Sequence, residues 1–373
     1  MNNWFKLILL VIFACILQNC RFFPKSKSGQ LGYNIVQENI INTTLPEHHI
    51  KLNYHIDDDN KFLTWLNQYP LSINILNIEH SDSIISIAVD NISHISYFIK
   101  GKDSVVILKT WQGSNFLIIL DMLGDTIAHH EILIENNQGK SFSTSEPFSL
   151  HNNILYAFVG QYVRNPNSSE HIKNFYSAPH QLRVPLSDDY QLRGKVEGGT
   201  FPQMYQEDNH FPNPYISQII MGDTIYYSFG SCDDIQMEVK GSRGMNIPAS
   251  SNYLKEFTPY PREKLRDYAF ARKYNIQEGR YYRIYYDKHK NYFYRVVFHG
   301  AKYANDDGTL NDMYDKPWSI ITLDGNLKRV KETLMDNVRY YPYIAGITKE
   351  GLIIRRLVND PNLFQCDLLT INY

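Results

Sequence analysis

Residues 281–298 read YYRIYYDKHKNYFYRVVF. Two runs rich in aromatic and β-branched residues, 281–286 and 292–298, flank the polar segment DKHKN. Such residues suit the pleated, half-buried surface of a sheet. Asp and Asn supply the backbone conformations that a tight connection needs. The stretch therefore predicts an antiparallel hairpin.

Side-chain alternation divides the second run of this hairpin into two faces. One face carries Tyr292, Tyr294, Val296 and Phe298, and the other carries Phe293, Arg295 and Val297. Both faces are largely apolar, which favours a strand packed between two neighbouring sheets. Tyrosine beside arginine also suits a platform for a carbohydrate or a peptide. The same two interpretations apply to Tyr340, Tyr341 and Tyr343, which follow Arg339.

Similar short strands recur along the chain, bounded by Gly, Asn, Asp or Pro. The sequence predicts them at 62–66, 73–78, 84–89, 105–110, 116–120, 127–134, 154–159, 215–221, 224–229, 235–239, 281–286, 292–298, 318–323 and 352–357. Many are joined by short turns, as at Gly222-Asp223. We therefore expect an all-β fold made of antiparallel meanders.

A weak internal similarity indicates how the meanders are arranged. Residues 117–121 read LIILD and residues 320–324 read IITLD, and each segment leads through a Gly to a returning strand. This pattern is common in propeller blades. We expect a β-propeller of six blades, with seven as the alternative, and one inserted helix near 261–274. Polar segments at 162–177 and 194–213 are expected to be long loops.

The first thirty residues predict export. Residues 7–17 are uninterrupted apolar, too few to span a bilayer but typical of a signal peptide. The segment LQNC at 17–20 resembles the lipobox of bacterial lipoproteins, although Asn19 is larger than the usual residue before the cysteine. We predict a signal peptide over 1–19, lipid attachment at Cys20, a tether over 20–30 and one propeller domain over 31–373. A soluble periplasmic protein cleaved elsewhere is the alternative.

Charge and cysteine content limit the classes of partner. The formal net charge is −2, so there is no basic excess for nucleic-acid binding. The fold contains two cysteines, Cys232 and Cys366, which either pair in an oxidising compartment or remain buried thiols. No acidic run follows Cys20, which favours a protein that faces the periplasm from the outer membrane over one exposed at the cell surface.

The segments 292–298 and 316–324 resemble a Bacteroidetes lipoprotein family, domain-of-unknown-function family 4221. The resemblance covers most of the chain after the signal peptide and is clearest in its last third. It implies a propeller similar to the TolB and six-bladed types. It implies no activity.

The sequence contains no complete catalytic, metal or nucleotide motif, so we predict no catalytic residue, no metal and no cofactor. His130-Glu131 lacks the second histidine of a zinc protease, because Ile134 stands in its place. Gly139-Lys140-Ser141 lacks the first glycine of a phosphate loop. The histidine pairs 48–49 and 129–130 are expected to be solvated or hydrogen-bonded. The acidic clusters 57–59 and 233–234 are expected to form turns rather than catalytic or calcium-binding sites.

Three functional hypotheses follow. The first is a non-enzymatic binding or scaffold protein, held at the membrane by lipid on Cys20, that recognises a protein, peptide or glycan. The second is an envelope hydrolase or lyase acting on glycans, which requires carboxylates from several blades to converge in the central channel. The third is a structural component of an outer-membrane complex, which requires a large apolar patch on the surface.

Overall fold

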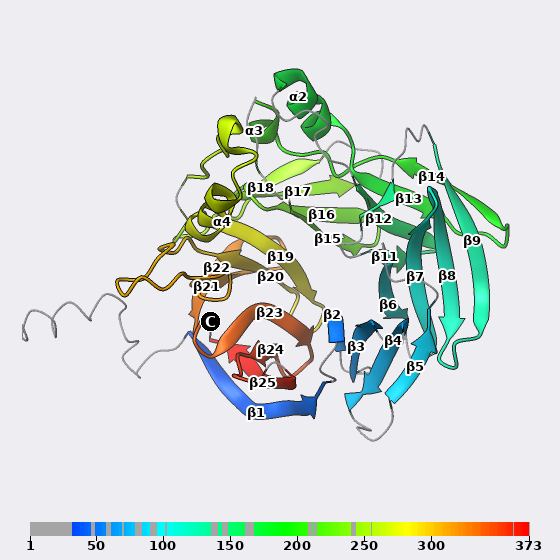
Figure 1. Cartoon of the computed structure of the whole chain (residues 1–373), viewed down its shortest axis with the longest axis horizontal. Helices are drawn as coiled ribbons and strands as arrows, with labels where there is room; N and C mark the ends of the chain where they lie inside the picture. The colour runs from blue at the N-terminus through cyan, green and yellow to red at the C-terminus, as the bar shows by residue number, and fades with distance from the viewer. Residues whose placement is uncertain are drawn as a thin grey trace, which may run out of the picture.

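The computed structural model describes residues 32–372, apart from segments at 46–48, 57–60, 69–70, 79–83, 90–94, 101–102, 136–140, 144–147, 161–167, 208–210, 212–214, 240–243, 255 and 361. Within these residues the fold is all-β with a few short helices, and its sheets are arranged around a central axis as in a propeller (Figure 1). No helix in the described part of the chain is long and apolar enough to cross a membrane.

The first sheet has eight strands and joins the two ends of the described chain. It follows the order β1 (Tyr33–Thr44), β25 (Leu363–Ile371), β24 (Leu352–Arg356), β23 (Tyr340–Ile347), β2 (His49–Ile56), β3 (Lys61–Gln68), β4 (Leu71–Asn77) and β5 (Ile84–Ala88). Its two halves are antiparallel meanders. They meet at one parallel pair, Ile56 with Gly346.

The second sheet has nine strands and the same construction. One half is β6 (Ile95–Lys100), β7 (Ser104–Trp111), β8 (Ser114–Asp121) and β9 (Thr126–Ile134). The other half is β10 (Ser141–Phe142), β11 (Ser149–His151), β12 (Ile154–Gly160), β13 (Gln181–Pro185) and β14 (Gln191–Val196). Parallel pairing of β9 with β14 joins them.

Two further sheets are simple antiparallel meanders of four strands each. One contains β15 (Ile216–Met221), β16 (Thr224–Phe229), β17 (Asp234–Val239) and β18 (Met245–Pro248). The other contains β19 (Arg280–Asp287), β20 (Tyr292–Phe298), β21 (Trp318–Leu323) and β22 (Arg329–Met335).

The arrangement has four sheets, so the prediction of six blades, or of seven, is wrong. The sequence pattern reports antiparallel meanders, and these are present. It carries no signal for the parallel hydrogen bonds at β2–β23 and β9–β14 that merge neighbouring meanders into larger sheets. Every predicted strand overlaps an observed one.

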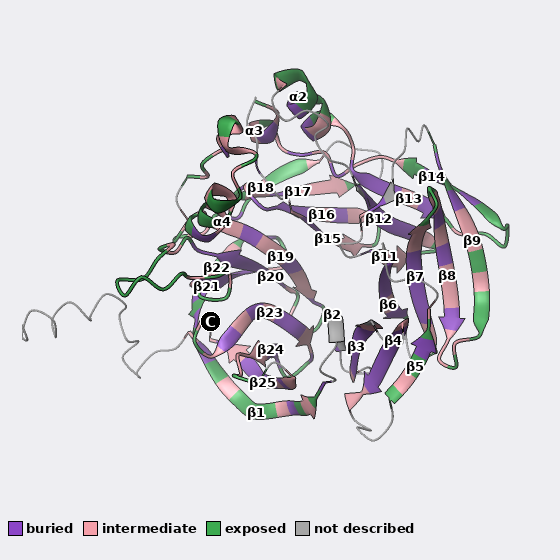
Figure 2. Cartoon of the chain, in the orientation of Figure 1, coloured by how far each residue is buried: buried purple, intermediate pink, exposed green. Residues whose placement is uncertain are grey.

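The helical prediction is partly wrong. Residues 261–274 do not form one helix: a 3₁₀ turn, η2 (Arg262–Lys264), precedes α4 (Tyr268–Gln277), because Asp267 caps α4 by accepting from the backbone N–H of Phe270. Two segments expected to be loops contain helices, α2 (Ser169–Ser177) and α3 (Gln203–Gln206). Figure 2 shows α2 and α4 exposed over much of their surface, whereas strands such as β16 and β20 are mostly buried.

Hydrophobic clusters fill the spaces between consecutive meanders. One combines β20 and β21 with β23, β24 and β25, and includes Trp318, Tyr340 and Leu369. Another combines β12, β15 and β16 with the helical insertions α2 and α3, and includes Tyr176 and Tyr205. The meanders therefore stabilise one another face to face, with each core shared between neighbours.

A buried carboxylate fastens the first strand to the last three. Asp367 of β25 has a side chain that is 0% exposed. It accepts from the backbone N–H of Asn39 in β1 at 2.9 Å, from the hydroxyl of Tyr340 at 2.8 Å and from Arg339 Nη2 at 2.9 Å. Together with the pairing of β1 and β25 from Tyr33–Ile371 to Thr44–Leu363, this closes the eight-stranded sheet.

Candidate functional site

Several residues singled out in the sequence lie outside the described residues. They are Cys20, His48, Asp57, Asp58, Asp59, Gly139 and Lys140. Lipid attachment at Cys20 therefore stays a prediction.

The histidine pair in β9 makes separate contacts. The ring of His129 lies 5.4 Å from that of Phe116 and 6.0 Å from that of Tyr190. His130 Nδ1 lies 2.7 Å from the carbonyl oxygen of Asp189. No three His, Cys, Asp or Glu side chains gather as a metal site among the residues with described positions.

Cys232 and Cys366 are both free and buried, so the alternative of two unpaired thiols is confirmed. Burial raises the pKa of each thiol. A buried thiol of raised pKa carries little thiolate at neutral pH and is therefore a poor nucleophile.

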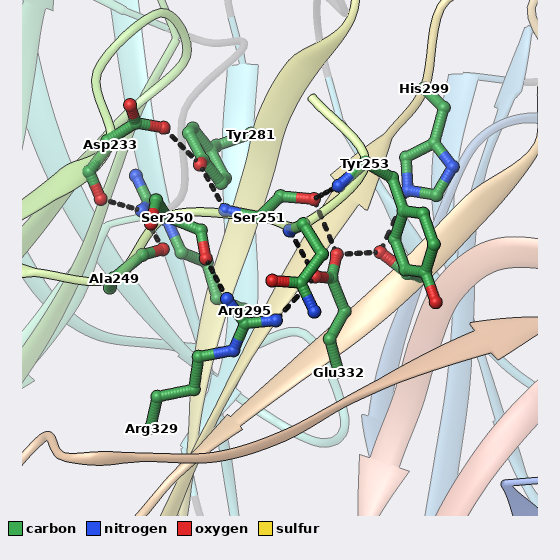
Figure 3. A network of polar contacts seen from close by, with 12 residues as sticks. Asp233, Ala249, Ser250, Ser251, Tyr253, Tyr281, Arg295, His299, Arg329 and Glu332 are labelled. Atoms are coloured by element: carbon green, nitrogen blue, oxygen red, sulfur yellow. Dashed lines mark hydrogen bonds and ion pairs between the residues drawn. The ribbon is translucent and has the colours of Figure 1, made fainter. Parts of the chain in front are cut away.

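Asp233 supports the fold. Its carboxylate accepts from the hydroxyl of Tyr281 at 2.5 Å, and its carbonyl oxygen accepts from Arg295 Nη1 at 2.5 Å. The hydroxyl of Tyr281 in turn accepts from the backbone N–H of Ser251 at 2.9 Å. These bonds join β17 and β19 to the connection that follows β18 (Figure 3).

Arg295 is the centre of this framework, and its predicted place in the core is confirmed, since it is 0% exposed. Its guanidinium donates to the carbonyl oxygens of Asp233, Ala249 and Cys232 at 2.5, 3.0 and 2.6 Å. Nε donates to Ser228 Oγ at 2.9 Å. The planar guanidinium therefore supplies hydrogen-bond donors to buried backbone carbonyl oxygens around β16 and β17.

Beside it lies a second network, which contains His299 and Glu332 (Figure 3) and is joined by Ser319. His299 Nε2 lies 2.9 Å from Ser319 Oγ, which donates to Glu332 Oε1 at 2.7 Å. In a hydrolytic triad the acid contacts the histidine, whereas here it contacts the serine. Ser319 is also 0% exposed within β21, so a substrate cannot reach its hydroxyl.

Glu332 instead holds a loop in place. It accepts from Ser251 Oγ at 2.5 Å and from the backbone N–H of Asn252 at 2.6 Å, and Arg329 Nη2 lies 2.9 Å away. Burial lowers the pKa of His299 to about 4, so its imidazole is neutral at pH 7. The network therefore holds residues 250–253 against β21 and β22 through hydrogen bonds.

The arrangement best suited to binding lies on β19 and β23, two strands that border the middle of the molecule in Figure 1. In β19 the pairing with β20 shifts between Tyr281 and Ile284, so Tyr282 and Arg283 form a bulge. In β23 the pairing with β24 shifts between Tyr340 and Ile344. Bulges redirect side chains and are frequent beside functional sites.

The two bulges meet. Arg283 Nη1 donates to the hydroxyl of Tyr343, and its guanidinium lies 4.8 Å from the centroid of that ring and 5.4 Å from the Tyr282 ring. Bulging thus places an arginine and two tyrosines from different sheets against one another.

More aromatic and cationic side chains surround this contact. Arg280 lies over Tyr215 at 4.9 Å, and the Tyr215 ring lies 5.6 Å from that of Tyr282. Arg355 lies over Tyr341 at 4.4 Å, and Tyr341 packs edge-on to Tyr314 at 5.0 Å. We define the arginine–tyrosine cluster as Tyr215, Arg280, Tyr282, Arg283, Tyr314, Tyr341, Tyr343 and Arg355.

The electrostatics of the cluster favour binding over acid–base catalysis. Burial raises the pKa of Tyr314 and Tyr343, so both phenols keep their protons at neutral pH. The carboxylate of Asp312 accepts from the backbone N–H of Tyr314 at 2.7 Å and is exposed. The described residues assemble no pair of carboxylates here of the kind that glycoside hydrolysis uses.

For Tyr340, Tyr341 and Tyr343 the sequence favours core packing, with a binding platform as the alternative. Tyr340 packs in the core, whereas Tyr341 and Tyr343 are half-buried members of the cluster. Arg280, Arg283 and Tyr215 were missed, because alternation along β19 cannot anticipate a bulge. Pro342, a poor strand residue between two tyrosines, was the available signal for irregularity in β23.

Comparison with solved structures supports the fold. A member of domain-of-unknown-function family 4221 from Bacteroides vulgatus superposes with a TM-score of 0.70 at 17% identity, covering 91% of this chain and 99% of that one. A protein from Bacteroides fragilis superposes with a TM-score of 0.47 at 10% identity, covering 92% of this chain and 95% of that one. No protein-family model and no curated protein matched the sequence. At 17% identity the likeness to the B. vulgatus structure shows the fold alone.

Proposed function

We propose that this chain is a lipid-anchored envelope protein of domain-of-unknown-function family 4221 that binds a ligand through its arginine–tyrosine cluster, without catalysis. The resemblance of residues 292–298 and 316–324 to that family supports membership, and so does the extent of the likeness to the B. vulgatus structure. The apolar run 7–17 and the cysteine at position 20 support the anchor.

One observation carries the binding function: the bulges of β19 and β23 coincide at Arg283 and Tyr343. A bulge interrupts the hydrogen-bond ladder of a sheet and redirects side chains. Two bulges that bring an arginine against tyrosines therefore favour a functional surface. Tyrosine and arginine are the residues that most often dominate binding energy at recognition surfaces.

The second hypothesis, a glycan hydrolase or lyase, finds no specific support. It requires convergent carboxylates, whereas the arginine–tyrosine cluster itself consists of cations and phenols. The Asp312 carboxylate beside it is exposed and accepts from the backbone N–H of Tyr314. The Ser–His–Glu network is buried and has its acid on the serine.

Two measurements test the proposal. Intact mass of membrane-extracted protein should show an acylated N-terminus at Cys20, and a Cys20→Ala variant should lose the acyl mass. An unmodified soluble chain would contradict the anchor.

For binding, the full-length chain should be applied to arrays of bacterial glycans and peptides beside an Arg283→Gln variant. We expect retained ligands in the wild type and loss in the variant. Turnover of an array compound at appreciable rates would overturn the non-catalytic assignment, and an array without any bound ligand would overturn the binding function.

A further inference from the structure

Within the cluster, Arg280 holds a charge that no described carboxylate neutralises. Its guanidinium lies between two rings, 4.9 Å from the centroid of Tyr215 and 5.6 Å from that of Phe298. Nη2 contacts the sulfur of Met313 at 3.6 Å, and Nε is buried without a hydrogen-bond partner. Burial lowers the pKa of this guanidinium. An unpaired, partly desolvated cation is costly unless something supplies an anion.

A second cation lies beside it. Lys316 is 0% exposed, and its Nζ lies 5.9 Å from the centroid of the same Phe298 ring. Nζ donates to the carbonyl oxygens of Asn275 and Glu278 at 2.9 and 2.6 Å, which uses two of its three protons. Burial and the neighbouring charge of Arg280 lower the pKa of Lys316 to about 7, while the carboxylate of Glu278 opposes the shift. Two adjacent cations around one ring therefore disfavour each other's charge.

The rest of the cluster indicates what carries that anion. Arginine and lysine only donate hydrogen bonds, and protonated phenols both donate and accept. Sugar hydroxyls can accept from such groups, and the apolar face of a sugar ring packs on aromatic rings. A peptide would offer carbonyl acceptors as well, so it is the apolar face of a sugar ring, which matches the tyrosine rings, that favours a sugar.

We propose that the arginine–tyrosine cluster binds an acidic sugar, with the carboxylate against Arg280 and the ring against Tyr215 and Tyr282. A guanidinium matches a carboxylate in two parallel hydrogen bonds. The side chain of Arg280 is partly exposed, although its Nε is buried, so we place the carboxylate against the outer nitrogens. Lys316 is enclosed, so it would act on the carboxylate through its charge and not through a direct contact. This inference rests on the proposed binding function and specifies its ligand.

The test is saturation-transfer NMR on the full-length chain with three probes: glucuronate, glucose and acetate. Glucuronate and glucose differ only at C6, which is a carboxylate in the first and a hydroxymethyl group in the second, and acetate supplies the carboxylate without a ring. We expect saturation transfer to glucuronate alone. The apparent affinity should fall at least about tenfold in Arg280→Gln, as for loss of charge-assisted hydrogen bonds. It should be unchanged in Arg193→Gln, an exposed arginine of β14.

Each other outcome overturns the inference in a different way. If glucose binds as well as glucuronate, the carboxylate is not recognised. If acetate binds as well as glucuronate, the sugar ring is not recognised. Binding of glucuronate that survives Arg280→Gln would place the ligand elsewhere. If glucuronate fails while array ligands are retained through Arg283, the acidic sugar is wrong but the binding function stands. If the arrays are also empty, both fail.

Discussion

The guanidinium of Arg295 lies over the ring of Tyr281, 3.4 Å from its centroid, at a depth where neither residue is exposed to solvent. The phenol of Tyr281 donates to Asp233, whose carbonyl oxygen accepts from the same guanidinium. Cation, ring and backbone thus form a closed set of contacts between β17, β19 and β20.

Replacing Arg295 by Met should lower the free energy of unfolding by about 3–5 kcal/mol, because several buried carbonyl oxygens lose their donor at once. Urea unfolding of the full chain measures the change. Arg193→Met, at an exposed arginine, should stay within about 0.5 kcal/mol of wild type. A similarly small change at Arg295 would mean that water replaces the guanidinium.

Asp367→Asn should loosen the closure of the eight-stranded sheet. The carboxylate accepts from Asn39, Tyr340 and Arg339, and the amide retains one acceptor oxygen and no charge. We expect a loss of about 3 kcal/mol and faster amide hydrogen exchange in β1 than in β20. Asp103→Asn, at an exposed turn, is the matched control. Uniformly faster exchange would argue against a local closure.

His299 should make the fold sensitive to acid. Its pKa is lowered from 6.5 to about 4 in the folded state by burial and by the charge of Lys316, while Glu332 opposes the shift. The unfolded chain therefore binds more protons between these values, so stability is complete above pH 6.5 and is lost as the pH falls towards 4.

The advantage of wild type over His299→Gln should accordingly shrink by about 1–2 kcal/mol between pH 7.5 and pH 5. Urea unfolding at the two pH values measures it. A constant difference between wild type and His299→Gln would mean that the imidazole titrates normally.

Tyr343→Phe should separate binding from folding. It removes the hydroxyl that accepts from Arg283 but keeps the ring that packs against the guanidinium. We expect the free energy of unfolding to change by about 1 kcal/mol or less, and array binding to weaken because Arg283 loses its orientation. Tyr268→Phe, at a residue 90% exposed, should affect neither. Undiminished binding would remove Arg283 from the recognition surface.

The strands could be read from the sequence where composition and turns agree, as in β15–β16 and β19–β20. β1 could not, because its residues are mostly polar and exposed and its partner lies at the other end of the chain. The number of sheets depends on parallel pairs such as Ile56–Gly346, which leave no local pattern. The helix α2 was missed within a polar segment, although Ser168 caps it.

The candidate site was harder to predict than the fold. A period of two describes a regular strand, and both β19 and β23 depart from it at the residues that form the arginine–tyrosine cluster. Arg280 and Lys316 are brought together by the Phe298 ring, from a strand and from the long connection between β20 and β21. Such a meeting is a property of the tertiary structure.

The pairing of β1 with β25 also sets an order of events in time. Asn34 and Asn372 are hydrogen-bonded across 338 positions. Closing a loop of that length costs about 5 kcal/mol of chain entropy, recovered only once both strands are present. In a chain that emerges N-terminus first, β1 cannot pair until β25, more than 300 residues later, has also emerged. We therefore expect folding to be slow and to be completed only when β1 pairs with β25. Until then the unpaired edges of both strands are exposed and prone to aggregate.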